Sequence, residues 1–94
     1  MINVKVKLTL IKKTMENGTL EIENDSTVKD LIRRLADGRG KKWKKMLIDP
    51  RTNEVYSYYL ILVSGLPVRA LEDGLETKLK DNDEVAIIPA LVGG

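Results

Sequence analysis

Hydrophobic and polar residues alternate at the start of the chain. Apolar residues occupy the even positions from Ile2 to Leu10, and lysine, asparagine and threonine occupy the odd ones. A period of two predicts a strand with one buried face and one exposed face. The Asn17–Gly18 pair then predicts a tight turn, and alternation resumes at residues 19–23. The chain is therefore expected to open with a β-hairpin.

The next segment changes to a helical period. Apolar residues at i, i+3, i+4 and i+7 predict one buried helical stripe, formed by Val28, Leu31, Ile32 and Leu35. Thr27 precedes Asp30 by three residues, which resembles a capping box at the helix start. Gly38 and Gly40 are expected to end the helix. This stripe is the natural cover for the apolar face of the hairpin, which indicates an α+β fold.

A basic cluster follows, and it contains the only tryptophan of the chain. Within GRGKKWKKM (residues 38–46), Trp43 and Met46, followed by Leu47, have the spacing of one helical face. The favoured interpretation is a short amphipathic helix with its lysines in solvent. Basic residues around an aromatic ring also suit phosphate contact and base stacking. Nucleic-acid binding is the less favoured alternative, and it would use Lys41, Lys42, Trp43, Lys44 and Lys45.

The second half of the chain contains further strand-forming runs. DPRTNE (49–54) is a turn-rich loop, and the β-forming run at residues 56–63 predicts a central strand covered on much of both faces. Residues 64–71 predict a tight turn and a short return strand. The last strand, EVAIIP, is expected to end at Pro89, because proline has no N–H for the ladder. Parallel pairing of the first and last strands at the sheet centre, with the helix crossing over them, gives a β-grasp arrangement.

Composition narrows the possible chemistry. The 94 residues form one domain and include neither cysteine nor histidine. Disulfides, thiolate zinc sites, cysteine nucleophiles and the usual general base are therefore excluded. Asp81, Asp83 and Glu84 are expected to form a solvated loop, so no metal site is predicted. The N-terminal segment is neither a signal peptide nor a membrane span, and a cytoplasmic protein without membrane contact is expected.

The C-terminal end carries the most specific pattern. The element order, the stretches LILVSGLPV and GLETKLKDNDEVAIIP and the final GG resemble the small subunit of molybdopterin synthase (MoaD). They are similar more broadly to the ubiquitin-like sulfur carriers (ThiS) and the small archaeal modifiers of the β-grasp superfamily. The family pattern is matched by Leu79, Asp81, Asn82, Asp83, Glu84, Val85, Pro89, Gly93 and Gly94. Two departures are visible: Ala90 follows Pro89 where many members have a second proline, and Asn82 replaces the usual glycine.

The resemblance implies a fold and a domain division. The fold is a ubiquitin-like β-grasp, with a mixed sheet of four to five strands covered by one main helix plus a short second helix. Residues 1–89 are expected to form this domain, and residues 90–94 a flexible Gly-Gly tail. Asparagine at position 82 is compatible with the left-handed backbone that a tight turn requires.

The resemblance also implies a function for the tail. The carboxylate of Gly94 would be adenylated with ATP by a separate enzyme, and a sulfur donor would then convert it to a thiocarboxylate. The chain would be a carrier, not an enzyme, and would bind no cofactor permanently. Gly93 and Gly94 lack side chains and so suit a narrow channel. Apolar residues near a terminus often mark an interface, and the expected partner-binding arm consists of Pro89, Ala90, Leu91 and Val92.

Several destinations for the activated terminus stay open. In the favoured interpretation a molybdopterin synthase large subunit binds the tail and receives its sulfur for molybdenum cofactor biosynthesis. Alternatively, the terminus is attached to lysines of target proteins, as in a ubiquitin-like modifier. Sulfur delivery for tRNA thiolation or thiazole synthesis is a further branch. A β-grasp interaction module without this chemistry is the alternative from another class.

Overall fold

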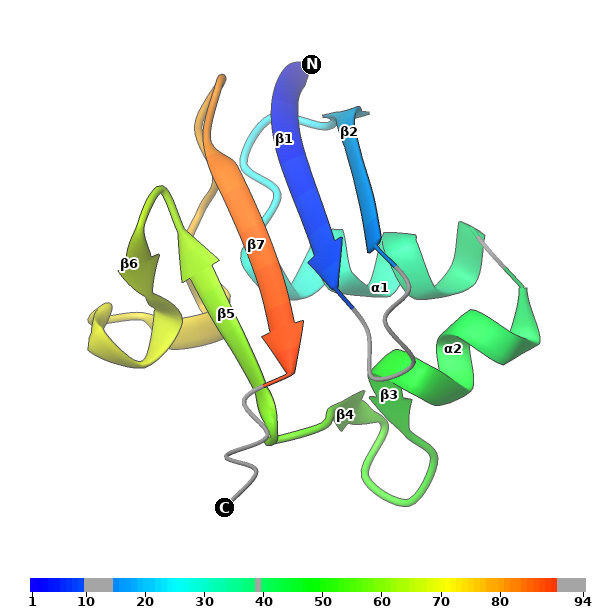
Figure 1. Cartoon of the computed structure of the whole chain (residues 1–94). Helices are drawn as coiled ribbons and strands as arrows, with labels where there is room; N and C mark the ends of the chain where they lie inside the picture. The colour runs from blue at the N-terminus through cyan, green and yellow to red at the C-terminus, as the bar shows by residue number, and fades with distance from the viewer. Residues whose placement is uncertain (10–14, 39, 90–94) are drawn as a thin grey trace.

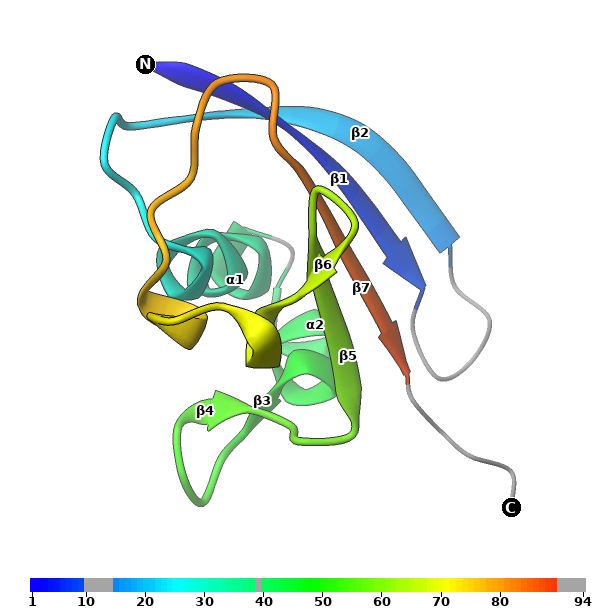
Figure 2. The same cartoon turned by 90° about the vertical axis from the view of Figure 1, so that its left-hand side faces the viewer.

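The computed structural model describes residues 1–9, 15–38 and 40–89, apart from the side chains of Met15, Glu16, Lys42 and Trp43. A five-stranded mixed sheet has the strand order β2-β1-β7-β5-β6. Its strands are β1 (Ile2–Thr9), β2 (Met15–Ile22), β5 (Tyr59–Val63), β6 (Leu66–Pro67) and β7 (Glu84–Pro89). The other elements are α1 (Val28–Gly38), α2 (Lys41–Leu47), the paired β3 (Ile48–Asp49) and β4 (Glu54–Val55), and 3-10 turns η1 (Val68–Ala70) and η2 (Gly74–Glu76). Both helices lie on the same side of the sheet, as Figures 1 and 2 show.

The first and last strands of the domain lie side by side at the centre of the sheet. Strand β1 pairs in parallel with β7, in a register that places Lys5 opposite Glu84 and Leu8 opposite Ile87. Strand β1 is antiparallel to β2, and β7 is antiparallel to β5. The predicted parallel pairing and the α+β β-grasp fold are therefore confirmed.

The predicted turn at Asn17–Gly18 is wrong. Both residues lie inside β2, where Asn17 pairs with Lys7 and Gly18 with Val6. The connection between the two strands runs between Thr9 and Met15, so it includes residues 10–14, outside the described part of the chain. A ladder of eight residue pairs outweighs the local turn preference of a dipeptide, since glycine inside a strand costs only about 0.5–1 kcal/mol.

The start of α1 has the predicted capping box. The Thr27 backbone N–H donates to Oδ2 of Asp30 at 3.0 Å, and the Asp30 N–H donates to Oγ1 of Thr27 at 3.2 Å. These reciprocal bonds satisfy two N–H groups at the helix start, which has no intrahelical acceptors for them. The helix ends at Gly38, as predicted, and Gly40 precedes α2 with a φ of 91°.

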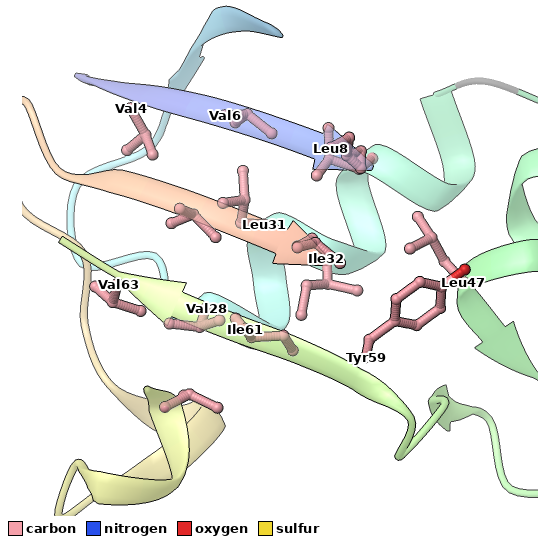
Figure 3. Close-up of a cluster of buried hydrophobic side chains, with 14 of the residues drawn as sticks. Val4, Val6, Leu8, Val28, Leu31, Ile32, Leu47, Tyr59, Ile61 and Val63 are labelled. Carbon is pink, nitrogen blue, oxygen red and sulfur yellow. The ribbon is translucent and has the colours of Figure 1, made fainter. Parts of the chain in front are cut away.

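The core lies between the sheet and the helices (Figure 3). The predicted helical stripe is buried in full. It packs against inward-facing residues of the sheet, among them Val4, Val6, Leu8, Ile61, Val63, Val85 and Ile87. Leu47 of α2 is completely buried and Met46 is half-buried, which confirms the short amphipathic helix. The side chain of Trp43, predicted to share that face, is outside the described part.

Strand β5 is shorter than predicted. It begins at Tyr59, and its inward residues are buried whereas Leu60 and Leu62 are only half-buried. The outward face of this strand is therefore less covered than its inward face, and the prediction of cover on much of both faces holds. The predicted tight turn and return strand are present: Ser64 and Gly65 have φ values of 47° and 87°, as a two-residue hairpin turn requires.

Candidate functional site

Strand β7, at the centre of the sheet, ends one residue before the predicted tail. Its last residue, Pro89, pairs with Tyr59 of β5 and is half-buried. Pro89 is the only residue of the predicted arm and tail that lies within the described part. Ala90, Leu91, Val92, Gly93 and Gly94 lie outside the described residues. The structure thus fixes the point from which the tail begins.

An apolar patch lies on the sheet face opposite the helices. Successive side chains of a strand point to opposite faces, so the completely buried Val85 and Ile87 of β7 alternate with outward-facing Ala86 and Ile88. Ile88 pairs with Leu60 across the β7–β5 ladder, and Leu62 pairs with both Ala86 and Pro67. We call this set the open-face patch; it consists of Leu60, Leu62, Pro67, Ala86 and Ile88.

The open-face patch is exposed where it approaches the tail. Ile88, one residue before Pro89, is 37% exposed. Leu60 beside it is half-buried, and Pro67 at the sheet edge is exposed. Exposed apolar side chains that adjoin one another are typical of interaction sites. Sequence reasoning assigned partner contact to Pro89 and the residues after it, and missed this patch, because Leu60 and Leu62 lie in a run predicted to be covered on much of both faces.

Charged residues border the patch on the β1 side. Lys5 and Lys7 alternate with the buried residues of β1, so they share the outward face, and Lys7 pairs with Ala86. Nζ of Lys7 lies 3.5 Å from Oε1 of Glu84, and both side chains are well exposed. Such an exposed ion pair contributes about 1 kcal/mol at most. The lysines therefore remain available to a partner's acidic groups.

The acidic turn before β7 has a structural role. The Asn3 N–H donates to Oδ1 of Asp81 at 2.8 Å. Oδ2 of Asp83 accepts the Lys80 N–H at 2.8 Å, and Oδ1 accepts the Ser64 hydroxyl at 3.0 Å. Between them, Asn82 has a φ of 71°, which confirms the predicted left-handed backbone. The turn ties the start of β7 to β1 and to the β5–β6 turn.

Metal-binding side chains do not cluster in the part of the chain that the structure describes. No group of three or more aspartate, glutamate, cysteine or histidine residues there could hold an ion. Neither α1 nor α2 is long and apolar enough to cross a membrane.

A tyrosine cluster packs beside the start of the tail. The rings of Tyr56 and Tyr58 are stacked with centroids 5.0 Å apart, and the ring of Tyr59 lies 4.9 Å from that of Tyr58. The Tyr59 hydroxyl donates to the carbonyl oxygen of Met46 at 2.8 Å. Burial, with a further effect from Tyr58, raises the pKa of Tyr59 to about 12. Tyr59 thus connects β5 to α2 as a neutral hydrogen-bond donor, next to Pro89.

Comparison with known proteins identifies the family. The model of the ThiS family matches residues 8–94. The chain belongs to the ThiS family. A candidate sulfur carrier protein of Archaeoglobus fulgidus is 38% identical over 92 residues, which cover 97% of this chain and 98% of that protein. The expected family of ubiquitin-like sulfur carriers, which are not themselves catalysts, is thus confirmed.

Solved structures share the fold of this ThiS-family chain. The small archaeal modifier protein 1 of Methanosarcina acetivorans is 30% identical with a TM-score of 0.71, over 100% of this chain and 98% of that one. The small archaeal modifier protein 1 of Haloferax volcanii has a TM-score of 0.73 at 20% identity, over 98% and 99% of the two chains. The second likeness concerns the fold alone.

Proposed function

We propose that this ThiS-family protein carries sulfur on the carboxylate of Gly94. The observation that carries the proposal is the position of β7: a central strand ends at Pro89, and residues 90–94 follow directly. A strand held on both sides is a rigid base for a tail that must reach into another protein. The likeness to a candidate sulfur carrier at 38% identity supports the same chemistry.

In the proposed reaction the chain is the substrate. The Gly94 carboxylate attacks the α-phosphate of ATP, and pyrophosphate leaves. Hydrosulfide released by a sulfur donor then attacks the carbonyl carbon of the acyl-adenylate, AMP leaves as the carbon–sulfur bond forms, and loss of the thiol proton gives the thiocarboxylate. The activating enzyme binds the ATP, and no cofactor stays on the chain. A free carboxylate is a poor electrophile, so activation by adenylation is the step that the partner must provide.

The open-face patch is the proposed docking surface for the activating enzyme. It continues directly into Pro89 through Ile88, so an enzyme that covers the patch also receives the tail. Lys5 and Lys7 at its border favour acidic groups on the enzyme. Ala90, Leu91 and Val92 would extend the apolar contact into the channel, and Gly93 and Gly94 would pass its narrow end.

Two destinations of the sulfur or acyl group are proposed in order. The first is a molybdopterin synthase large subunit, because the pattern from Leu79 to Val85 and the Gly-Gly end resemble MoaD. The second is conjugation to lysines of target proteins. The likeness to the small archaeal modifier protein 1 of Methanosarcina acetivorans, at 30% identity over the whole chain, favours this second function.

Intact mass spectrometry tests the proposal. The protein is incubated with the activating enzyme of its own source, ATP and a sulfur donor, beside a variant that lacks Gly94. A mass increase equal to the exchange of one oxygen for sulfur, absent in the deletion variant, is expected. Covalent adducts on lysines of lysate proteins would place the modifier function first. Neither product, with an enzyme active on another substrate, would overturn both.

A further inference from the structure

A groove runs along the helix side of the molecule. Helices α1 and α2 and the β3–β4 pair surround three cavities of about 120, 140 and 150 Å³. All three are lined by Ile48 and Asn53, and Arg33 and Lys44 each line two of them. Shared lining residues make the cavities one continuous surface, which we call the helix-side groove. Figure 2 shows these elements on the side of the sheet away from the open-face patch.

The floor of the groove is apolar. Ile32 and Ile48 are core residues that also face the cavities. Val55 and Leu75 are half-buried and extend this floor under α1, and Pro50 extends it beside α2. Each cavity therefore offers apolar contact to an inserted side chain. Such contact is worth about 0.8 kcal/mol for each buried methylene group.

The rim of the groove is basic at the α2 end. Arg33, Lys41, Lys44 and Lys45 line the two cavities there, with Asp37 as the only acidic residue that lines them. Nζ of Lys44 lies 3.4 Å from Oδ1 of Asp37. Among the side chains that the structure describes, which exclude that of Glu16, no ion pair joins Arg33, Lys41 or Lys45 to a carboxylate.

The opposite end of the groove is nearly neutral. There Nζ of Lys29 lies 3.9 Å from Oε1 of Glu76, and Glu54 lines the same cavity. Positive potential is therefore concentrated at the α2 end. The groove thus combines an apolar floor with a one-sided basic rim.

We propose that the helix-side groove binds an acidic peptide segment of a partner protein, in which carboxylates flank apolar side chains. The carboxylates would pair with the lysines of α2, and the apolar side chains would enter the cavities over Ile48. A nucleic acid fits this surface less well. Phosphates would satisfy the basic rim, but they would leave the apolar walls of the cavity beneath Lys41, Lys44 and Lys45 without an apolar partner.

This inference goes beyond the proposed carrier function and does not depend on it. The groove lies on the helix side, and the open-face patch lies on the other face of the sheet. A peptide in the groove therefore leaves the activating surface uncovered. The protein would bind two partners at once, one through each side.

Titration with a defined peptide tests the groove. The probe is a fluorescein-labelled synthetic peptide of alternating glutamate and leucine. Two control peptides replace every leucine by serine or every glutamate by glutamine. Polarisation gives the affinity, and amide shifts of the nitrogen-15-labelled full chain give the location. We expect amide shifts at Lys44, Ile48 and Asn53 and none at Ile88. Both control peptides should bind at least tenfold more weakly than the leucine–glutamate peptide.

Charge reversal gives the matched variants. Lys41→Glu with Lys45→Glu is expected to weaken the leucine–glutamate peptide about tenfold, since each lost rim ion pair costs up to about 1 kcal/mol and repulsion adds to it. Lys80→Glu, an exposed lysine outside the groove, is expected to leave the affinity unchanged. Neither change should alter thiocarboxylate formation. A thermal melt checks that each variant is folded. If the double variant does not fold, the single variant Lys45→Gln tests the rim lysines in its place.

Three results would overturn the inference. One is equal binding by the wild type and the lysine variants. Another is peptide-induced shifts on the open face instead of the groove. The third is tighter binding of a single-stranded oligonucleotide than of the peptide, with Lys41 and Lys45 required for it. The ligand of the groove would then be a nucleic acid.

Discussion

Two adjacent isoleucines of β7 separate folding from partner docking. Ile87 is completely buried among the core residues, whereas Ile88 is 37% exposed in the open-face patch. The same substitution, isoleucine to threonine, keeps a β-branched side chain suited to a strand. Ile87→Thr is therefore expected to damage stability, and Ile88→Thr to damage docking. Each variant is the control for the other.

The two burial values set the expected magnitudes. At Ile87 the lost apolar group costs about 1 kcal/mol, the cavity adds to this, and a buried hydroxyl without a partner adds about 1–3 kcal/mol. The free energy of unfolding should fall by about 2–4 kcal/mol, and Tm by about 10–25 °C. At Ile88 the hydroxyl reaches water, so the stability cost should stay below about 1 kcal/mol.

Kinetics complete the comparison. At a temperature where both variants are folded, KM for the activating enzyme should rise about three- to tenfold for Ile88→Thr, because an apolar contact is lost from the interface. KM should be unchanged for Ile87→Thr. Urea denaturation measures the stability, and the rate of thiocarboxylate formation against protein concentration measures KM. Equal stability losses would refute the assigned faces of β7, and an unchanged KM for Ile88→Thr would refute the docking surface.

Two further predictions concern hydrogen bonds of the domain. Tyr59→Phe leaves the Met46 carbonyl without its partner and should lower the free energy of unfolding by about 1–2 kcal/mol. The pKa of Tyr59 is about 10 in the unfolded chain and is raised to about 12 in the folded protein. The contribution of Tyr59 to the free energy of unfolding is therefore complete below pH 10 and is lost as the pH rises to about 12. Urea denaturation across that range should show a larger loss in the wild type than in Tyr59→Phe, which keeps only the effect of Tyr58, whose pKa is also raised by burial. Thr27→Ala and Asp30→Ala should each cost about 0.5–2 kcal/mol, and the double variant less than their sum; additivity would contradict the reciprocal capping bonds.

Local patterns were sufficient to predict most of the fold. The alternation of β1, the stripe of α1 and the Thr27–Asp30 box each involve residues close together in sequence, and each is present in the structure. The parallel pairing of β1 with β7 followed from the element order. The prediction of a turn at Asn17–Gly18 failed because the pairing of β1 with β2 continues past this dipeptide, whose preference for a turn is weak. The length of a strand pairing depends on the partner strand, so no local pattern predicts it.

The site was predicted only in part. The end of β7 at Pro89 was predicted from the sequence, and partner contact at Pro89 stays a prediction. The acidic turn was predicted as a solvated loop, but its hydrogen bonds to β1 and to the β5–β6 turn were not predicted. Asp81 and Asp83 accept hydrogen bonds from Asn3 and Ser64, which are distant in sequence. Such partners meet only after the sheet has formed. The helix-side groove was missed in the same way, because it combines α1, α2 and the β3–β4 pair.

The outward faces of β5 and β7 are a guide to function. The runs YLILV and EVAII are apolar on both strand faces, and this pattern is typical of strands covered on both sides. Strand β1, by contrast, places Lys5 and Lys7 on its outward face. Among the described residues, no helix or strand lies over the outward residues of β5 and β7 (Figure 2): Ala86 is buried, Leu60 and Leu62 are half-buried, and Ile88 is exposed. An apolar face that the described part of the chain leaves partly exposed favours cover by another protein. It occurs on the strand that leads to Gly94 and on that strand's neighbour, where a partner that modifies the tail would have to dock.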